Sequence, residues 1–354
     1  MLSTHPSTQD AGQLATAGQR YCVGIVGAGN VGCYFGAHLC QDSALDVKFF
    51  GRETMALELA AHGLCAISVD KQNYFAQPVA FYSALNSLIE CDVVLLTVKA
   101  TALLAMIAQL KRFLRPDVPV IALQNGIGIA QMLAQDLPNP ILRALVPFAI
   151  SKGNAGQFCR STDGNISWQQ NDFAVVNYLI SVCNRLQLKV ELHTDIIAAE
   201  YGQLLPALND AINVLSQIPL QQQWRSADYR HLLAAAMQEW LKVCTAAGIA
   251  TQPCCGVPNR LLPFLLRLPT RMFSMLLGRR LNIEAPGHSA MWEQLQAKKP
   301  TEIMFLNAAV VRMAQRYAIA APVNQLLTDW IKRAEAGETD FPSARALLAQ
   351  AGKR

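Results

Sequence analysis

A glycine-rich loop between a short apolar run and a helical stretch constrains this fold more than any other feature. Gly27, Gly29 and Gly32 form GxGxxG directly after CVGIV and directly before a helix that extends to Cys40. The first glycine of such a loop allows a tight turn, the second lets the backbone approach a pyrophosphate, and the third permits close packing of helix on strand. The helix N-terminus then faces the phosphates. We therefore predict a dinucleotide-binding loop, with a plain tight turn as the alternative, formed by Gly27, Ala28, Gly29, Asn30, Val31 and Gly32.

The segments around this loop predict two domains. From Tyr21 to about Thr194, short apolar runs alternate with amphipathic stretches, which is typical of parallel strands joined by crossover helices. After Thr194 the apolar residues recur at helical spacing, as between Leu204 and Leu208. We expect an α/β, Rossmann-like N-terminal domain with a mostly parallel sheet, an all-α C-terminal domain, and a disordered polar tail, with bounds at 21–195, 196–345 and 1–20.

Composition excludes several classes of protein. The charged fraction is 16%, below the roughly 25% of an average soluble protein, so much of the surface is expected to face inward or another subunit. The net charge of +5 arises from residues spread along the chain, without the basic block that nucleic acid binding requires. The ten cysteines include no CxxC pair and no Cys/His spacing typical of zinc sites. We expect a cytoplasmic, reducing location and no metal.

The most apolar segment, Leu261 to Leu281, is too often interrupted by arginine and proline to span a membrane. A pair of core helices is expected there, and a helix at a membrane surface is the alternative. Residues 1–20 contain neither a basic start nor an apolar stretch, so no secretory signal is expected.

The second strand of the α/β half ends at a basic residue. Gly51 and Arg52 follow VKFF about 20 residues after the last loop glycine, where an NAD enzyme usually carries a carboxylate for the ribose hydroxyls. A guanidinium at this point can pair with the 2′-phosphate of NADPH. Arg52 therefore predicts NADPH as the cofactor. Glu53 binding a ribose diol and Arg52 as an ordinary solvated charge are the alternatives.

Polar residues at two further strand ends are part of a resemblance between this chain and a known family. Thr97-Val98-Lys99 and Leu123-Gln124-Asn125-Gly126 lie at the carboxyl edge of the predicted sheet, where ligands bind. The chain resembles the ketopantoate reductase (2-dehydropantoate 2-reductase) family from about Tyr21 to Lys332, through these segments, the glycine loop, Tyr201–Leu205, Asn209, Asn213, Ser289–Met291, Thr301–Ile303 and Leu306-Asn307. The resemblance implies NADPH-dependent reduction of 2-dehydropantoate to pantoate, a step toward pantothenate and coenzyme A.

The resemblance also implies roles for individual residues. It places Lys99 and Asn125 with the glycine loop and Arg52 at the cofactor, Asn209, Asn213 and Ser289 at the substrate, and Glu302, Asn125 and Gln203 at the catalytic centre. Simpler interpretations remain open. Lys99 would be an exposed strand-end charge, Asn125 part of a plain turn, and Glu302 a carboxylate favoured by a helix dipole. The two asparagines, four residues apart on one helix face, would form helix–helix hydrogen bonds.

In the family, the catalytic lysine lies on a helix with the pattern aromatic residue, any residue, Lys-Leu, followed by asparagines. The corresponding helix of this chain departs from that pattern. If Tyr201 matches the aromatic residue, the lysine position is Gln203, and if the asparagines are matched it is Leu205. Ala290-Met291 replaces a Ser-Met pair, Gln294 an acidic residue, and Met304 an aspartate. Loss of a general acid typically costs about 10²–10⁴-fold in rate. Lys152 and His193 are candidate substitutes.

Three hypotheses follow. The first is ketopantoate reductase, and the second is an NADPH-dependent reductase of a different keto acid, because the altered residues lie where selectivity would be set. The third is a non-catalytic NADPH-binding sensor. In each case we expect a small-molecule partner rather than nucleic acid or a membrane, with a homodimer through the helical domain as an open alternative.

Overall fold

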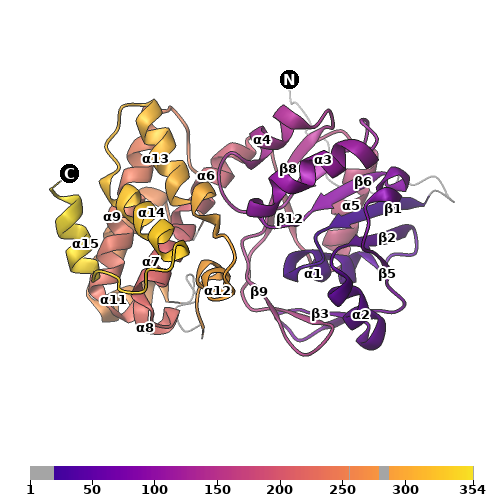
Figure 1. Cartoon of the computed structure of the whole chain (residues 1–354), viewed down its shortest axis with the longest axis horizontal. Coiled ribbons are helices and arrows are strands. Elements are labelled where there is room, and N and C mark those ends of the chain that lie inside the picture. The colour runs from indigo at the N-terminus through magenta and orange to yellow at the C-terminus, as the bar shows by residue number, and fades with distance from the viewer. Residues whose placement is uncertain (1–19, 255, 279–286, 354) are drawn as a thin grey trace, which may run out of the picture. The chain divides into compact units, whose positions relative to one another are not determined.

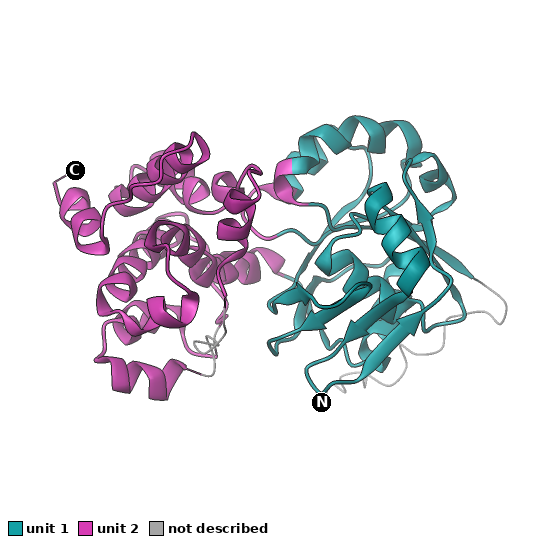
Figure 2. Cartoon of the chain, turned by 60° about the horizontal axis from the view of Figure 1, so that its bottom comes forward, with its two compact units in different colours: residues 1–98, 102–124, 130–194 teal, residues 99–101, 125–129, 195–354 magenta. Residues whose placement is uncertain are grey.

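The chain forms two compact units in a computed structural model that describes residues 20–254, 256–278 and 287–353. Unit 1 consists of residues 1–98, 102–124 and 130–194, and unit 2 of residues 99–101, 125–129 and 195–354 (Figure 2). The predicted tail over 1–20 lies outside the described residues, apart from Arg20.

Unit 1 is built on a large sheet whose strand order is β12-β11-β8-β7-β6-β1-β2-β5 (Figure 1). Neighbouring strands run parallel, except that β11 is antiparallel to β8. The central strands β6 and β7 are apolar throughout and fully buried, as a sheet covered on both faces requires. The strands are β1 (Tyr21–Val26), β2 (Leu45–Phe50), β5 (Ala80–Tyr82), β6 (Val93–Leu96), β7 (Val120–Ala122), β8 (Ile141–Leu145), β11 (Ile166–Gln169) and β12 (Val190–His193).

A second, smaller sheet in unit 1 was not among the sequence predictions. Its order is β4-β3-β10-β9, with β3 parallel to β10 and the other two pairs antiparallel. Strands of three or four residues give too short an alternation to be distinguished from loops in a sequence. The strands are β3 (Leu64–Ile67), β4 (Asn73–Ala76), β9 (Ile150–Lys152) and β10 (Gln157–Arg160).

Helix α1 contacts strands of both sheets. Every residue of α1 from Gly32 to Leu39 is buried, so this helix is covered on all sides rather than on one face. The shape of the glycine loop therefore depends on a helix that is fixed on several sides. The remaining helical segments that begin between residues 30 and 194 are α2 (Glu53–His62), η2 (Asn86–Glu90), η3 (Ala100–Ala102), α3 (Leu103–Phe113), α4 (Ile129–Asp136) and α5 (Ala174–Arg185), with α1 over Asn30–Leu39.

The described part of unit 2 that follows Thr194 is helical, which with the mostly parallel sheet of unit 1 confirms the predicted fold class. Its long helix α9 provides Leu233, Met237 and Trp240 to the core. The indole Nε1 of Trp240 donates to the Tyr201 carbonyl at 2.8 Å and so joins α9 to α6. The helical segments are α6 (Ile196–Ala207), α7 (Asn209–Ser216), α8 (Leu220–Arg225), α9 (Ala227–Ala246), η4 (Asn259–Leu261), α10 (Leu262–Leu266), α11 (Thr270–Leu277), α12 (Ala290–Gln296), η5 (Glu302–Phe305), α13 (Asn307–Arg316), α14 (Pro322–Glu335) and α15 (Ala344–Ala351).

The apolar segment beginning at Leu261 forms α10 and α11 in its described part. Leu266 and Phe273 are fully buried, whereas Phe264 and Met275 are exposed. The buried Arg230 guanidinium of α9 donates to the carbonyls of Leu266 and Leu268, which fixes this segment against α9. Among the described residues, no helix combines the length and apolar character needed to cross a membrane.

The close packing of α1 on β2 predicts the effect of a single methyl group. In Gly36→Ala the new Cβ would lie 2.2 Å from Cζ of the fully buried Phe49. Such overpacking costs about 1–3 kcal/mol, so we expect the free energy of unfolding in urea to fall by that amount. Gly29→Ala is the matched control, because its Cβ would meet no atom within 4 Å. Equal stability of the two variants would contradict the role of Gly36 in helix packing.

Candidate functional site

The three glycines of the GxGxxG loop have different surroundings. Gly27 has φ +110°, and a Cβ there would lie 2.5 Å from the Val98 backbone nitrogen. At Gly32 a Cβ would lie 2.3 Å from the Gly27 carbonyl oxygen. Gly29 is exposed, and no heavy atom lies within 4 Å of the position its Cβ would occupy. Gly27 and Gly32 thus serve the turn and the helix packing, whereas Gly29 leaves its backbone open to a ligand.

The N-terminus of α1 follows this open glycine. Gly29 is the N-cap residue and provides no side-chain cap, and no acidic residue lies in the first turn. The first N–H groups of a helix have no intrahelical acceptor and carry its positive dipole end. The Asn30 side chain donates instead to the Ile150 carbonyl at 3.0 Å. These features fit a pyrophosphate, because bare N–H donors and a glycine without neighbours accommodate phosphate oxygens.

Arg52 follows β2 and lies at the N-cap position of α2. It is exposed, and the adjacent Gly51 packs against the loop, because a Cβ at Gly51 would lie 3.0 Å from Cβ of Ala28. The structure therefore places the Arg52 backbone beside the glycine loop. Glu53, the alternative contact for a ribose, is the next residue and is also exposed.

Thr97 holds the loop in place, a role that the sequence prediction missed. Its Oγ1 donates to the Gly27 carbonyl at 2.6 Å and lies 3.2 Å from the Val26 carbonyl. A threonine at the end of the neighbouring parallel strand was the available signal, since parallel strand ends meet at one edge of the sheet.

Within unit 2, the Glu302 carboxylate contacts the side chains of Lys99 and Gln294 and the backbone nitrogen of Ala100, and we call these four residues the Glu302 cluster. Glu302 Oε1 accepts from the Ala100 backbone nitrogen at 3.0 Å. Its Oε2 accepts from Gln294 Nε2 at 3.2 Å and lies 3.4 Å from Lys99 Nζ. The Glu302 side chain is only 15% exposed, whereas that of Lys99 is 57% exposed. The arrangement thus leaves the ammonium group accessible to a ligand.

The turn at Asn125 and Gly126 packs against the same segment as Glu302. Gly126 has φ +105°, and a Cβ there would lie 2.7 Å from the Phe305 carbonyl oxygen. The Ile127 backbone nitrogen donates to that carbonyl at 2.9 Å. Asn125 itself is exposed. The turn is therefore packed against η5 and is more than a surface connection, and the structure brings Lys99, Asn125 and Glu302 into one unit.

Asp210 is a titratable residue of unit 2 that the sequence prediction did not single out. It lies in the first turn of α7 and is partly buried. Desolvation and the negative charge of Glu302 raise the pKa of its carboxyl from 3.8 to about 7, and Lys99 partly opposes this shift. No hydrogen bond to its carboxylate is formed by the residues that the structure describes. An aspartate beside two matched asparagines was the only sequence signal.

Asn209 and Asn213 share one face of α7, as predicted, and that face packs against α8. Gln223 Nε2 donates to Asn209 Oδ1 at 2.7 Å, and Asn213 Nδ2 donates to Gln223 Oε1 at 2.7 Å. Asn213 is fully buried, and its Oδ1 also accepts from the Ser289 backbone nitrogen at 2.8 Å. Ser289 Oγ lies 3.2 Å from the Asp210 carbonyl and caps α12 by accepting from Trp292. These side chains form the helix–helix bonds of the alternative interpretation.

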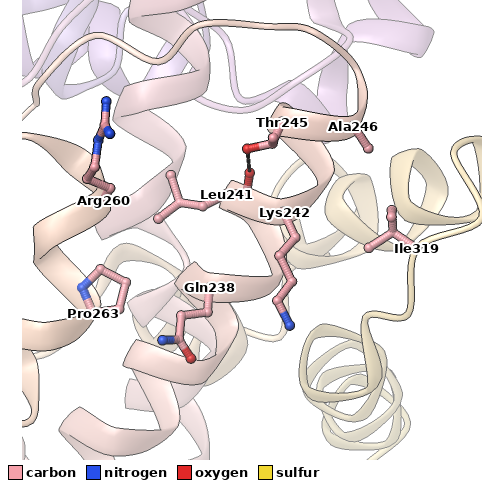
Figure 3. A pocket seen from close by; sticks show the side chains of 8 residues that line it. All are labelled: Gln238, Leu241, Lys242, Thr245, Ala246, Arg260, Pro263 and Ile319. Carbon is pink, nitrogen blue, oxygen red and sulfur yellow. Dashed lines mark hydrogen bonds between the residues drawn. The ribbon is translucent and has the colours of Figure 1, made fainter.

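A separate hollow of about 600 Å³ on unit 2 contains none of the predicted site residues (Figure 3). Lys242 and Arg260 lie at its wall with Leu241, Pro263 and Ile319. Among the described residues there is no group of histidine, cysteine or acidic side chains that would hold a metal, and every described cysteine is free.

Two family descriptions cover most of the chain. Residues 23–172 match "Ketopantoate reductase PanE/ApbA", and residues 204–335 match "Ketopantoate reductase PanE/ApbA C terminal". The chain belongs to the ketopantoate reductase family. The predicted resemblance is confirmed, and membership identifies a ketopantoate reductase-like oxidoreductase.

Individual members of the ketopantoate reductase family are distant from this chain. A 2-dehydropantoate 2-reductase of Vibrio cholerae is 24% identical over 319 residues, which cover 88% of this chain and 97% of that protein. A PanE/ApbA family ketopantoate reductase of Ralstonia eutropha has a similar fold, with a TM-score of 0.75 at 22% identity over 89% of this chain and 98% of that one. D-mandelate dehydrogenase, solved with NADH and anilino(oxo)acetate, gives a TM-score of 0.73 at 18% identity, over 89% and 98% of the chains.

The structure supplies no amine at either position predicted for the family's lysine. Gln203 lies on α6 and is partly buried, and Leu205 is fully buried in the apolar core. The candidate substitutes lie in unit 1: Lys152 forms an ion pair with Glu58, and His193 ends β12. Lys99 is the amine of the Glu302 cluster.

The hydrogen bonds around Gln223 generate a prediction for stability. Gln223→Leu keeps much of the side-chain volume but leaves Asn209 Oδ1 and one Asn213 amide proton without their partner. Leaving buried polar groups unsatisfied costs about 1–3 kcal/mol each, so we expect a fall of at least that size in the free energy of unfolding. Gln222→Leu, at the exposed neighbour on α8, is the control. A stable Gln223→Leu protein would show that this network is dispensable.

Proposed function

We propose that this protein reduces a 2-keto acid with NADPH, and that 2-dehydropantoate, reduced to pantoate, is its substrate. The observation that carries the proposal is the Glu302 carboxylate held by the Ala100 N–H and Gln294 beside the exposed ammonium of Lys99. Such a site offers an acceptor for a substrate hydroxyl and a cation for a substrate carboxylate. Pantothenate and coenzyme A synthesis would be the pathway served.

In this proposal unit 1 holds the cofactor. The N-terminus of α1 and the open backbone at Gly29 take the pyrophosphate, and Arg52 pairs with the 2′-phosphate. When bound, NADPH supplies a hydride to the carbonyl carbon of the substrate. Thr97 keeps the loop in shape through its bond to the Gly27 carbonyl.

Unit 2 holds the substrate in this proposal. Lys99 and the Asn125 amide bind the carboxylate and the developing oxyanion, and Glu302 accepts from a hydroxyl group. Asn213 and Ser289 position α7 against α12, since their polar atoms bond to one another. Asn209 retains an amide donor, because only its Oδ1 is bonded among the described residues.

A different 2-keto acid is the second candidate, favoured by the replacement of the family's lysine and by Met304, which is 42% exposed where the family carries an aspartate. The fold similarity to D-mandelate dehydrogenase adds an aromatic 2-keto acid to the substrates worth testing. NADPH consumption with a panel of aliphatic and aromatic 2-keto acids distinguishes these candidates. NADPH binding without turnover on any of them would support the non-catalytic alternative.

The cofactor half of the proposal predicts separable effects at two positions. Arg52→Ala should weaken NADPH binding by about 10–100-fold, because a charge-assisted contact contributes about 1.5–3 kcal/mol, with little effect on NADH. Gly29→Ala should weaken both cofactors and leave stability unchanged, because its Cβ meets only open space. Fluorescence titration measures both affinities, with Arg112→Ala on the exposed surface of α3 as the control. Unchanged NADPH affinity in Arg52→Ala would reject the assignment.

The substrate half predicts a loss confined to catalysis and substrate binding. Glu302→Gln should lower kcat/KM for 2-dehydropantoate at least about tenfold, because a charged hydrogen bond to the substrate becomes a neutral one. NADPH affinity should stay unchanged. Glu293→Gln, on the exposed face of α12, is the matched control. Equal turnover by Glu302→Gln and the control would remove Glu302 from the site.

A further inference from the structure

We propose that Cys22 and Cys91 form a site of reversible oxidation by hydroperoxides, at which Cys22 reacts first and Cys91 then closes a disulfide with it. The two thiols lie in contact in unit 1, with 3.7 Å between their sulfur atoms. The proposal goes beyond the proposed function and does not depend on it, because it concerns the chemistry of the two thiols alone.

The backbone of unit 1 holds the two cysteines side by side. Cys22 is the second residue of β1, and Cys91 lies two residues before β6, which pairs with β1. The Cys22 carbonyl accepts from the Asp92 backbone nitrogen at 2.8 Å, and the Cys22 backbone nitrogen donates to Asp92 Oδ2 at 2.9 Å. Two hydrogen bonds thus fix Cys22 against the residue that follows Cys91.

Gly24 leaves room for the Cys91 thiol beside Cys22. Side chains alternate between the two faces of a strand, so residues 22 and 24 of β1 share one face. A Cβ at Gly24 would lie 2.9 Å from Cys91 Sγ and 3.2 Å from Cδ2 of Leu88, so these side chains occupy the space over the glycine. Cys91 is fully buried. Its thiol therefore has little freedom to leave Cys22.

Cys22 is the accessible member of the pair. It is partly exposed and lines a hollow of about 370 Å³, whose other lining residues are Arg20, Tyr21, Asp46 and Asp92. A small, uncharged hydroperoxide can enter a hollow whose wall carries charges of both signs. Cys91, which is fully buried, is not reached in this way. The difference in exposure sets the order of the two steps.

The surroundings of Cys22 also favour its thiolate, which is the form that attacks a peroxide. The hydrogen bond with Cys91 and the charge of Lys48 lower the pKa of Cys22, against burial and the charges of two aspartates. Lys48 lies on β2, where the parallel register places it opposite Gly24. By contrast, burial raises the pKa of four other cysteines to about 12: Cys33, Cys40, Cys183 and Cys244.

The oxidation balances in two steps with one hydroperoxide. The Cys22 thiolate attacks a peroxide oxygen, so that an S–O bond forms, the O–O bond breaks, and the leaving hydroxide or alkoxide takes up the proton that Cys22 released. The Cys91 sulfur then attacks Cys22 Sγ. The S–S bond forms, the S–O bond breaks, and the hydroxyl group leaves as water with the Cys91 proton. The two sulfur atoms lose two electrons, which the peroxide gains, and a small dithiol reverses the bond by exchange.

The first test treats the reduced, full-length protein with hydrogen peroxide and maps its thiols by mass spectrometry. We expect the protein to lose two of its ten thiols, counted after denaturation, and to yield a linked peptide pair that contains Cys22 and Cys91. Dithiothreitol should restore both thiols. Absence of the linked pair, or linkage of other cysteines to an equal extent, would overturn the proposal.

Variants separate the roles of the two residues. In Cys91→Ala, Cys22 should react but stop at the sulfenic acid, which dimedone captures, whereas the wild type should give little of this adduct. Cys22→Ser should retain its other thiols. Cys65→Ser, at another partly buried cysteine, is the matched control and should behave as wild type, with circular dichroism to establish that each variant is folded. Equal dimedone capture in wild type and Cys91→Ala would remove Cys91 from the site.

Thermal unfolding provides a second readout that does not depend on peptide mapping. A disulfide here would join residues 69 positions apart, and a long closed loop stabilises a protein mainly by constraining its unfolded chain. Oxidation should therefore raise the unfolding midpoint of the wild type and leave that of Cys22→Ser unchanged. An unchanged or lower midpoint of the oxidised wild type would show that the native sheet does not accommodate the bond, and would overturn the proposal.

Discussion

The close approach of α1 to the strands beneath it is the constraint on which the architecture of unit 1 depends. Gly32 and Gly36 bring this helix so near to Gly27 and Phe49 that a methyl group at either glycine would overlap its neighbour. Because α1 is also covered by the small sheet, it has little freedom to shift. The position of its N-terminus, and with it the open backbone at Gly29, is therefore set by packing. A phosphate site made of backbone groups needs this rigidity, since it has no long side chains with which to adjust.

In unit 2, hydrogen bonds between buried side chains fix the positions of α7, α8 and α12. Gln223 ties α8 to Asn209 and Asn213, and Asn213 in turn holds the start of α12 through Ser289. These bonds add to the apolar packing of the same helices, because α7 contributes Ile212 and Leu215 to the core and α12 contributes Met291. The polar groups of the Glu302 cluster thus rest on a network in which each buried amide specifies its neighbour, as buried polar networks commonly do.

The sequence predicted the features that depend on a local residue pattern. It missed those that depend on contacts between residues far apart in the chain. The glycine loop, the parallel strands and the asparagine face of α7 follow from spacing, and the structure shows them. The hydrogen bond of Thr97 to Gly27 joins residues 70 positions apart. No periodicity encodes such a pairing. The prediction for Gln203 rests on matching one helix to the family pattern, and such a match does not identify the residues that fold beside that helix.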